Sequence, residues 1–506
     1  MHAKTALPPL VAASITFGVG LLALACSSAA QPDSIFAHHA QGEVNGGTAD
    51  DGGTLSNGNG TDPTLTGNTI PDVDAGPACV NLQCKQVACP SGQHTTVSGT
   101  IYDPAGKNPL YNVVVYVPNA PTKAFTDHAT CDTCAALYTG DPLVTASTGS
   151  DGTFTLKDVP AGTNIPLVIQ IGKWRREITL PTVTSCVDNP ITDKDQSRLP
   201  KNRTEGDIPK MAVSTGGSDS LECLLKRIGV DPAEYTSGTG DERVHIFQGT
   251  GGNAVSGGST ASKTGLWSTE ADLATYDIVI LSCEGDEHAE TKPTTSMQAL
   301  EAYANAGGRI FASHFHYYWF EGAGSSTEFQ STATWKPGTN SIGSGNDVTS
   351  AAINTSFPKG LAFDQWMTLT KSLQADGTLQ IDNSRQNASV DPTGNPASQA
   401  WITDTTVPTM TVNGKTGPTT MYFDFNTPIA AKPADQCGRV VFSDLHVGAA
   451  SGDYSGGVNT IPAGCTAADL SPQEKALEFM LFDLSSCVTP DSTPPAPPPP
   501  APPAVK

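Results

Sequence analysis

The stretch from Tyr276 to Phe320 constrains the fold most, because it reads as a buried strand, a helix and a second buried strand. Asp277 to Ser282 is a short apolar run with the composition of a strand that is buried on both faces. Thr294 can cap a helix whose apolar positions recur at about 3.6 residues, and Arg309 to Ser313 reads as the next strand. In a sheet built from such crossovers, ligands sit beyond the carboxyl ends of the strands. We therefore expect any functional site at that edge.

Polar side chains gather at the predicted edge. The two strands of this stretch are followed by Cys283, Glu284, Asp286, His288, His314, His316 and Tyr317. A later apolar strand from Cys437 ends in Asp444 and His446. His314 and His316 are two positions apart, as are Asp444 and His446, so each pair points the same way if its strand continues. These four residues are candidate ligands for a divalent metal such as zinc.

A second interpretation of this edge is nucleophilic catalysis. Ser313 is a candidate nucleophile with His446 as its base and Glu284 or Asp444 orienting the ring. His314 completes this candidate catalytic set.

A third interpretation is ligand binding without chemistry. Tyr317 and Trp319 lie near Asp286 and His288, and aromatic rings beside polar groups suit carbohydrate. The same aromatic residues also suit plain packing against hydrogen-bonded, partly buried histidines. The sequence leaves these alternatives open.

The charge of the chain excludes one class of partner. The sequence has 28 Lys and Arg residues against 50 Asp and Glu residues, which gives a formal net charge of -22. Because no basic excess exists to neutralise phosphates, we expect no nucleic-acid partner. A length of 506 residues with 38% hydrophobic residues supports two or three domains.

Residues 1–26 are predicted to be a lipoprotein signal peptide, with one early lysine and then an apolar run. Their last four residues, ALAC, resemble a bacterial lipobox that departs from the usual pattern at Ala23, and an ordinary cleaved signal is the alternative. The resemblance implies lipidation at Cys26, a membrane partner through this anchor, and a place at the outer membrane of the cell envelope. Residues 27–78 are too polar to build a core and are predicted to be a disordered tether.

The chain has twelve cysteines, and eleven remain once Cys26 is set aside. In an exported protein these are expected to form disulfides, with one thiol left over. We predict a local bridge between Cys131 and Cys134, and a second between Cys437 and Cys487. Cys283 is expected to pair with Cys223 or Cys465, and the alternative is that it is a nucleophile.

Residues 79–186 show short strands separated by turn signals, which predicts an antiparallel β-sandwich. The segments VSGTIYDPAGKNPLYNVVVYV and TGSDGTFTLKDVPAG resemble the carboxypeptidase regulatory-like, or transthyretin-like, domain. That resemblance implies an accessory fold without catalysis. Residues 187–207 are polar and are predicted to be a linker.

Residues 208–487 resemble the class I glutamine amidotransferase-like fold and its ThuA-like branch. The matching segments are YDIVILSCEG, AGGRIFASHFHYYW and GRVVFSDLHVG, with an unmatched insertion at about 321–436. Catalytic members carry a cysteine at the turn after the second strand, where this chain has Ser313 and His314. Glutaminase activity is therefore not expected, because it requires a nucleophilic thiolate. Residues 488–506 are proline-rich and are predicted to be a disordered tail.

The predicted fold class is α/β plus all-β: an antiparallel β-sandwich followed by a flavodoxin-like open parallel sheet with an insertion. The predicted function is a lipid-anchored envelope protein that acts as a non-catalytic binding or surface module, with carbohydrate or another envelope component as its partner. The alternative is a hydrolase of a carbohydrate or amide that uses His314, His316, Asp444 and His446, with or without a metal.

Overall fold

The computed structural model describes residues 79–256, 260–342, 348–446 and 460–500. The predicted signal peptide, the lipidation of Cys26 and the tether lie outside the described residues. Within those residues, none of the helices has the length and apolar character needed to cross a membrane.

The first domain consists of two sheets, with strand orders β4-β1-β7 and β3-β2-β5-β6. Their bounds are β1 Thr96–Thr100, β2 Val114–Pro118, β3 Pro142–Ser147, β4 Thr153–Leu156, β5 Gly162–Ile171, β6 Trp174–Val183 and β7 Asp188–Ile191. Val97 of one sheet and Val115 of the other belong to the same hydrophobic cluster. The predicted linker is partly wrong, because β7 lies within it and pairs in parallel with β1.

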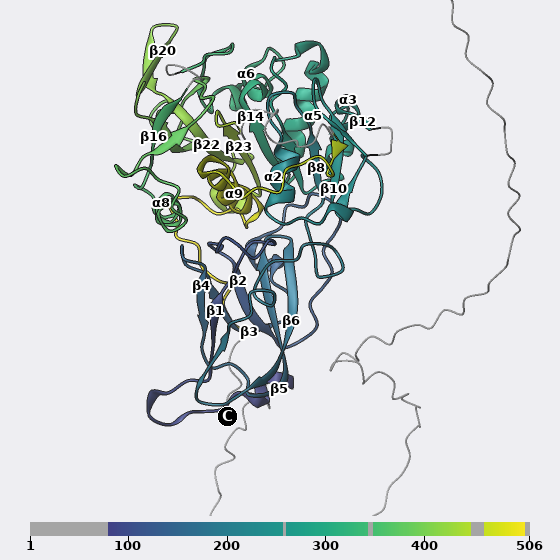
Figure 1. The fold of residues 1–506 in the computed structure, drawn as a ribbon, viewed down its shortest axis with the longest axis vertical. Helices are drawn as coiled ribbons and strands as arrows, with labels where there is room; N and C mark the ends of the chain where they lie inside the picture. The colour runs from purple at the N-terminus through teal and green to yellow at the C-terminus, as the bar shows by residue number, and fades with distance from the viewer. Residues whose placement is uncertain (1–78, 257–259, 343–347, 447–459, 501–506) are drawn as a thin grey trace, which may run out of the picture. The chain divides into compact units, whose positions relative to one another are not determined.

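The second domain is built on one mixed sheet (Figure 1). Its order is β12-β10-β8-β13-β14-β23-β22-β19-β16-β17. The bounds are β8 Met211–Ser214, β10 Val244–Gln248, β12 Ala261–Ser262, β13 Ile278–Leu281, β14 Arg309–Ser313, β16 Thr349–Ile353, β17 Leu379–Ile381, β19 Ser398–Asp404, β22 Thr420–Thr427 and β23 Gly438–Ser443. The strands from β12 to β23 pair in parallel, and those from β22 to β17 are antiparallel. The sheet is therefore mixed, where the sequence predicted a parallel one.

Helices cover both faces of this sheet. The longer helices are α2 Leu221–Arg227, α5 Thr294–Asn305, α8 Pro358–Leu369 and α9 Pro472–Ser485, and the short ones are α1 Cys134–Leu137, α3 Lys263–Leu266, α4 Glu270–Ala274, α6 Tyr318–Glu321 and α7 Thr327–Gln330. Successive residues of β13 point to opposite faces. Accordingly Ile280 clusters with Leu224 of α2 and Leu477 of α9, whereas Val279 clusters with Leu300 of α5.

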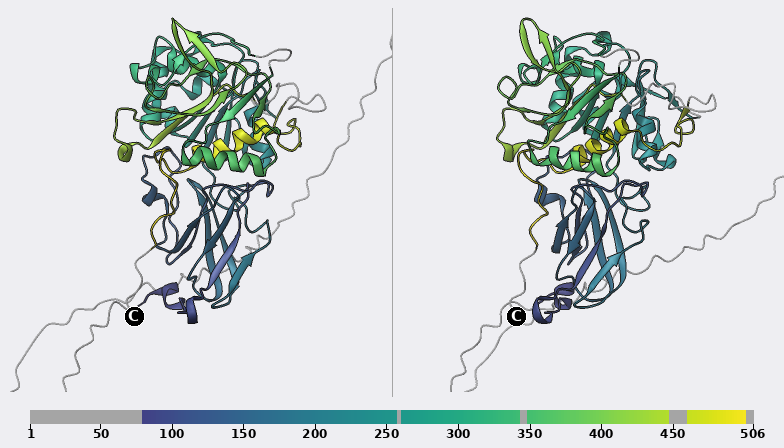
Figure 2. Two further views of the ribbon diagram at one scale, coloured as in Figure 1. Left: turned by 90° about the vertical axis from the view of Figure 1, so that its left-hand side faces the viewer. Right: turned by 60° about the vertical axis from the view of Figure 1, so that its left-hand side comes forward.

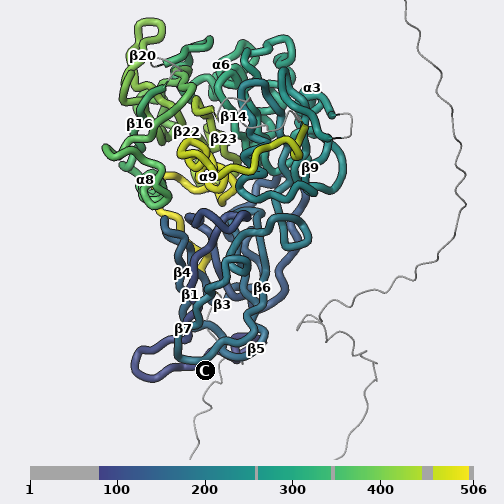
Figure 3. Tube along the Cα trace, viewed as in Figure 1, coloured from purple at the N-terminus to yellow at the C-terminus, as the bar shows by residue number. Residues whose placement is uncertain are grey.

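The insertion at about 321–436 extends the sheet with β16, β17, β19 and β22, as the trace from β14 and β23 outward shows (Figure 3). A hairpin of β20 Thr409–Val412 and β21 Lys415–Pro418 follows β19. Helix α8 lies beside α9 (Figure 2), and the ring centroids of Phe363 and Phe479 are 4.8 Å apart. The insertion thus lengthens the sheet at one edge and adds a helix to one face.

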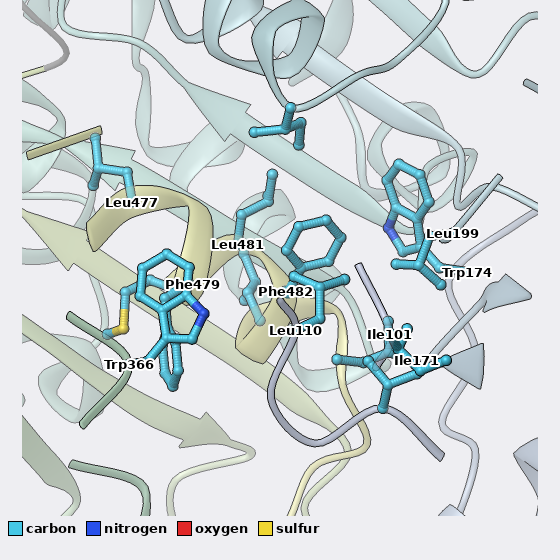
Figure 4. Packing of buried hydrophobic residues seen from close by; sticks show 14 of the residues in the cluster. Ile101, Leu110, Ile171, Trp174, Leu199, Trp366, Leu477, Phe479, Leu481 and Phe482 are labelled. Carbon is cyan, nitrogen blue, oxygen red and sulfur yellow. The ribbon is translucent and has the colours of Figure 1, made fainter. Parts of the chain in front are cut away.

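Aromatic side chains join the β-sandwich to α9 (Figure 4). Trp174 of β6 lies edge-on to Phe482, with ring centroids 5.8 Å apart. Tyr111 stacks on Phe479 at 5.6 Å. Gly172 is required at this contact, because a Cβ there would lie 1.8 Å from the carbonyl oxygen of Ser485.

Both predicted disulfides are wrong, because their four cysteines pair across the domains. The bridges are Cys79–Cys84, Cys89–Cys186, Cys131–Cys437, Cys134–Cys487 and Cys223–Cys465. The segment after β2 carries Cys131 and Cys134 to the second domain, a placement that a separation of 306 or 353 residues conceals in the sequence. The pairing of Cys283 with Cys223 or Cys465 is also wrong, since those two bond to each other. One described thiol, Cys283, is left over, as predicted.

The C-terminal segment departs from the predicted disordered tail. The carboxylate of Asp491 is 2.9 Å from Arg439 and 3.1 Å from Lys359, in a buried ionic cluster. Further along, the carbonyl of Pro498 accepts a hydrogen bond of 2.8 Å from Thr145. Ion pairs and a hydrogen bond therefore hold parts of this segment against the folded domains, although its composition predicts a solvent-exposed tail.

Candidate functional site

The site lies where β8, β13, β14 and β23 end. Leu281 pairs with Ala312, so Cys283 and His314 are each two residues past this pair. On the other side, Ser313 pairs with Ser443, three residues before His446. The strand register therefore carries Cys283, His314 and His446 past the same edge of the sheet.

Cys283 and His314 contact each other in the interior. The Sγ atom of Cys283 is 3.3 Å from Nδ1 of His314. Their residues are 0% and 2% exposed. His314 has a φ of 41°, in the left-handed region, so the chain turns sharply where β14 ends and a short 3-10 helix, His314–Tyr317, begins.

His446 completes a three-residue group. Its ring centroid is 4.9 Å from that of His314, and the residue is 3% exposed. One potential ligand atom from each of Cys283, His314 and His446 lies within 4.8 Å of the other two. This is the only group among the described residues that combines cysteine and histidine in this way.

Backbone carbonyls set the proton positions on both rings. Nδ1 of His446 is 3.0 Å from the carbonyl oxygen of Asn383, and Nε2 of His314 is 3.3 Å from that of Thr339. A carbonyl only accepts, so each of these nitrogens carries the hydrogen. The lone pairs are left on Nε2 of His446 and on Nδ1 of His314, which is the nitrogen beside Cys283.

The loop between β8 and α2 adds a carboxylate. The amide of Ser218 donates a 3.0 Å hydrogen bond to the carbonyl of Cys283. Gly216 permits this approach, because a Cβ would lie 2.0 Å from the same carbonyl oxygen. Asp219, which is 0% exposed, accepts a short hydrogen bond from Ser313.

Burial keeps the three groups neutral at pH 7. It raises the pKa of the Cys283 thiol to about 12, with a further increase from the charge of Asp219. Burial lowers the pKa of His314 well below its usual range, and His446 and Arg385 lower it further. Burial also lowers the pKa of His446, while Asp219 opposes the shift. The site therefore holds a thiol and two uncharged imidazoles.

His316 lies outside this group. The strand ends before it, so the expected alternation with His314 is lost. Its Nδ1 accepts a 3.0 Å hydrogen bond from Trp319 and its Nε2 lies 2.9 Å from the carbonyl of Ser282. Burial lowers the pKa of His316 to about 3. Both ring nitrogens are already used, which makes His316 a packing residue.

Asp444 also lies outside the group of cysteine and histidines. Its Oδ2 accepts a 2.8 Å hydrogen bond from the amide of Asn387. Burial raises the pKa of Asp444 to about 7. The proposed set of four metal ligands is therefore not assembled as the sequence suggested.

The predicted serine triad is not assembled either. Glu284 pairs with Lys263 and, at 3.4 Å, with Lys292. Burial alone raises the pKa of Glu284, but His316 and the two lysines outweigh it and lower the pKa to about 2. Ser313 donates to Asp219, as described above. Both carboxylates predicted to orient His446 are thus engaged elsewhere, Glu284 by the lysines and Asp444 by the amide of Asn387.

The predicted ligand-binding residues do not form an open platform. Tyr317 and Trp319 are 0% and 1% exposed. The Tyr317 hydroxyl donates to Glu287. Asp286 is exposed, and the ring of His288 is 3.2 Å from the carboxylate of Glu290. The two aromatic rings pack in the interior, and the two polar residues lie in the loop after β13.

The sequence placed Cys283 at this edge but not among the metal ligands, because a disulfide was expected there. Asp219 was not identified as a site residue. The available signal was positional, since the segments containing both residues directly follow strands β8 and β13.

No family model matches this chain, and neither does any curated protein. Among solved structures, it is similar to a Bacteroides uniformis protein described as ThuA-like, with 10% identity over 47% of this chain and 81% of that chain, and a TM-score of 0.26. A type II cohesin and X-dockerin complex from Acetivibrio cellulolyticus matches with 19% identity, 29% and 79% coverage and a TM-score of 0.15. A 9R-lipoxygenase from Cyanothece gives 12% identity, 24% and 17% coverage and a TM-score of 0.11. These TM-scores are too low to support an argument about function.

Proposed function

We propose that this chain is a lipid-anchored cell-envelope protein whose second domain binds a ligand without catalysing amidotransfer. In this proposal the first domain is a carboxypeptidase regulatory-like sandwich, and the second is a degenerate amidotransferase-like domain. The strand order supports a flavodoxin-like core. Numbered along the chain, β8, β10, β13, β14 and β23 follow the order 2-1-3-4-5.

The observation that carries this proposal is the residue at the turn after β14. His314 occupies that left-handed position. Catalytic members of the class I glutamine amidotransferase-like fold carry a cysteine there. The nearby Cys283 lies on the adjacent strand tip and is fully buried. At a pKa of about 12 its sulfur is protonated, and the thiol is a far weaker nucleophile than the thiolate.

Thiol reactivity tests this proposal. The purified protein is treated with iodoacetamide at pH 8, folded and in denaturant, and is assayed for hydrolysis of glutamine, nitrophenyl esters and nitrophenyl glycosides. We expect Cys283 to react only after unfolding, and no turnover that depends on it. Fast alkylation of the folded protein, with turnover that is lost in Cys283→Ser, would refute the proposal.

The envelope location has its own test. Cells expressing the full chain are fractionated, and the same is done for Cys26→Ser. We expect the unmodified chain in the outer-membrane fraction and the variant in the soluble fraction. Equal membrane association of both would contradict the lipid anchor.

A metal-dependent hydrolase is the second candidate. It is favoured by the group of Cys283, His314 and His446, because three protein ligands leave a fourth position open to water. The substrate would be a carbohydrate or an amide. Hydrolysis in the assays above that depends on added metal would select this candidate over the binding protein.

A further inference from the structure

We propose that Cys283, His314 and His446 bind one zinc ion at the carboxyl ends of β13, β14 and β23. The inference deepens the proposed function, on which it rests for the view that this site binds and does not react. It replaces the ligand set expected from the sequence, since His316 and Asp444 are excluded and a cysteine is included.

The donor atoms suit zinc. Thiolate sulfur and imidazole nitrogen are the ligands that this ion prefers. The Sγ of Cys283 and the Nδ1 of His314 are 3.3 Å apart, and one potential ligand atom of each of the three residues lies within 4.8 Å of the other two. Movement of these side chains would bring all three to bonding distance of one ion.

The two histidines make the second hydrogen bond that is usual for histidines that bind a metal. A histidine that binds a metal usually donates its other ring N–H to a carbonyl or carboxylate, which fixes the tautomer and the ring. His314 and His446 each do so, towards the carbonyls of Thr339 and Asn383. Both rings thus present a lone pair without a change of tautomer.

The charges around the site can compensate a divalent cation. Coordination supplies one negative charge on Cys283, and the carboxylate of Asp219 acts electrostatically on both Cys283 and His446. Arg385 contributes a positive charge to the same surroundings, where it also acts on Asp444. The thiolate and Asp219 together offset the two charges of the ion, and the single positive charge of Arg385 remains.

The other candidate group among the described residues is less suitable. Asp424, Asp483 and Asp491 bring carboxylate oxygens together. However, Arg439 is within 3.3 Å of Asp424 and 2.9 Å of Asp491, and Lys359 is 2.9 Å from Asp483. This acidic cluster already holds two cations of its own and has no vacancy for a third.

Burial sets the kind of ligand. Cys283, His314 and His446 are at most 3% exposed, so the group is enclosed and suits a bare ion better than a sugar. On binding, the S–H bond of Cys283 breaks and an S–Zn bond forms. The proton leaves to solvent, and no oxidation or reduction takes place.

Zinc stoichiometry tests the inference. The purified chain is stripped with a chelator, dialysed against zinc sulfate and then against metal-free buffer, and zinc is measured by atomic emission. We expect one zinc per chain. Cys283→Ser keeps nearly the same volume, and we expect it to raise the zinc dissociation constant more than about 100-fold, beyond the usual effect of an outer contact. His446→Gln, whose amide can still donate to Asn383, should act in the same direction.

His288→Ala is the matched control, because this histidine lies in the loop after β13 but outside the group. It should retain one zinc. Circular dichroism and thermal melting of each variant in chelator establish that it is folded. A second readout is the proton: zinc should release one proton per chain at pH 7.5, and Cys283→Ser should release none.

Three results would overturn the inference: a wild-type chain without stoichiometric zinc, equal affinity in Cys283→Ser, or loss of zinc only in Asp424→Asn. These results are independent of the hydrolysis assays. If the chain binds zinc and shows turnover that depends on Cys283, only the proposal of a non-catalytic function is refuted. If it shows neither zinc nor turnover, only the metal site is refuted.

Discussion

Removing the Cys134–Cys487 bridge should destabilise the protein by about 4 kcal/mol. With the Cys131–Cys437 bridge intact, the loop that this disulfide closes runs three residues back to Cys131 and fifty from Cys437 to Cys487. A loop of about 53 residues corresponds to about 4 kcal/mol of lost chain entropy in the unfolded state. The perturbation is the double substitution Cys134→Ser and Cys487→Ser, which leaves no new thiol.

The matched control is Cys79→Ser with Cys84→Ser, which opens a bridge between residues only five positions apart. The same relation gives about 2 kcal/mol for that loop. The assay is urea unfolding of the oxidised proteins followed by tryptophan fluorescence, since Trp174 lies at the contact between the domains. Equal losses in the two double variants, or the larger loss in the control, would refute the reasoning.

Three further predictions concern the buried ionic cluster and the packing around the site. Asp491→Asn should cost about 2 kcal/mol at pH 7: burial opposes ionisation, but Arg439 outweighs it and lowers the pKa of Asp491 to about 2. This contribution is present above pH 4 and is lost as the pH falls through 2, so urea titrations of both proteins should converge there, and a constant difference would contradict the pairing. His316→Ala should cost on the order of 3 kcal/mol by leaving the indole N–H of Trp319 unpaired, yet retain zinc in the emission assay; loss of zinc from a folded variant would make His316 part of the metal site. Gly216→Ala should lower both the melting temperature and the zinc content, because its Cβ would lie 2.0 Å from a backbone carbonyl, and unchanged values would show that the loop can shift freely.

The hydrophobic pattern of the sequence was sufficient to predict the local elements of the central stretch. The run from Asp277 to Ser282 contains β13, and the run from Arg309 to Ser313 is β14. Each of these signals spans only a few residues, so no contact with a distant segment is needed to interpret it. The edge of the sheet that bears the site followed from the same elements.

Contacts between distant segments were beyond the sequence. Cys131 and Cys134 resemble a local pair, and only the path of the loop after β2 shows that each bonds to the second domain. Asp491 lies in a proline-rich segment, and its burial depends on two cations far back in the chain.

The choice of site residues failed for a related reason. The spacing of His314 and His316 predicts a shared direction only if the strand continues, and the chain turns at His314 with a φ of 41°. Cys283 was expected in a disulfide because the cysteines of an exported chain are usually oxidised. The register of β13 against β14 instead places Cys283 beside His314.

X-ray absorption at the zinc edge reports the atoms bound to the ion and therefore shows directly whether Cys283, His314 and His446 are its ligands. We expect one sulfur at about 2.3 Å and two imidazole nitrogens at about 2.0 to 2.1 Å, with the sulfur absent in Cys283→Ser. A shell made only of oxygen and nitrogen in the unmodified protein would contradict it.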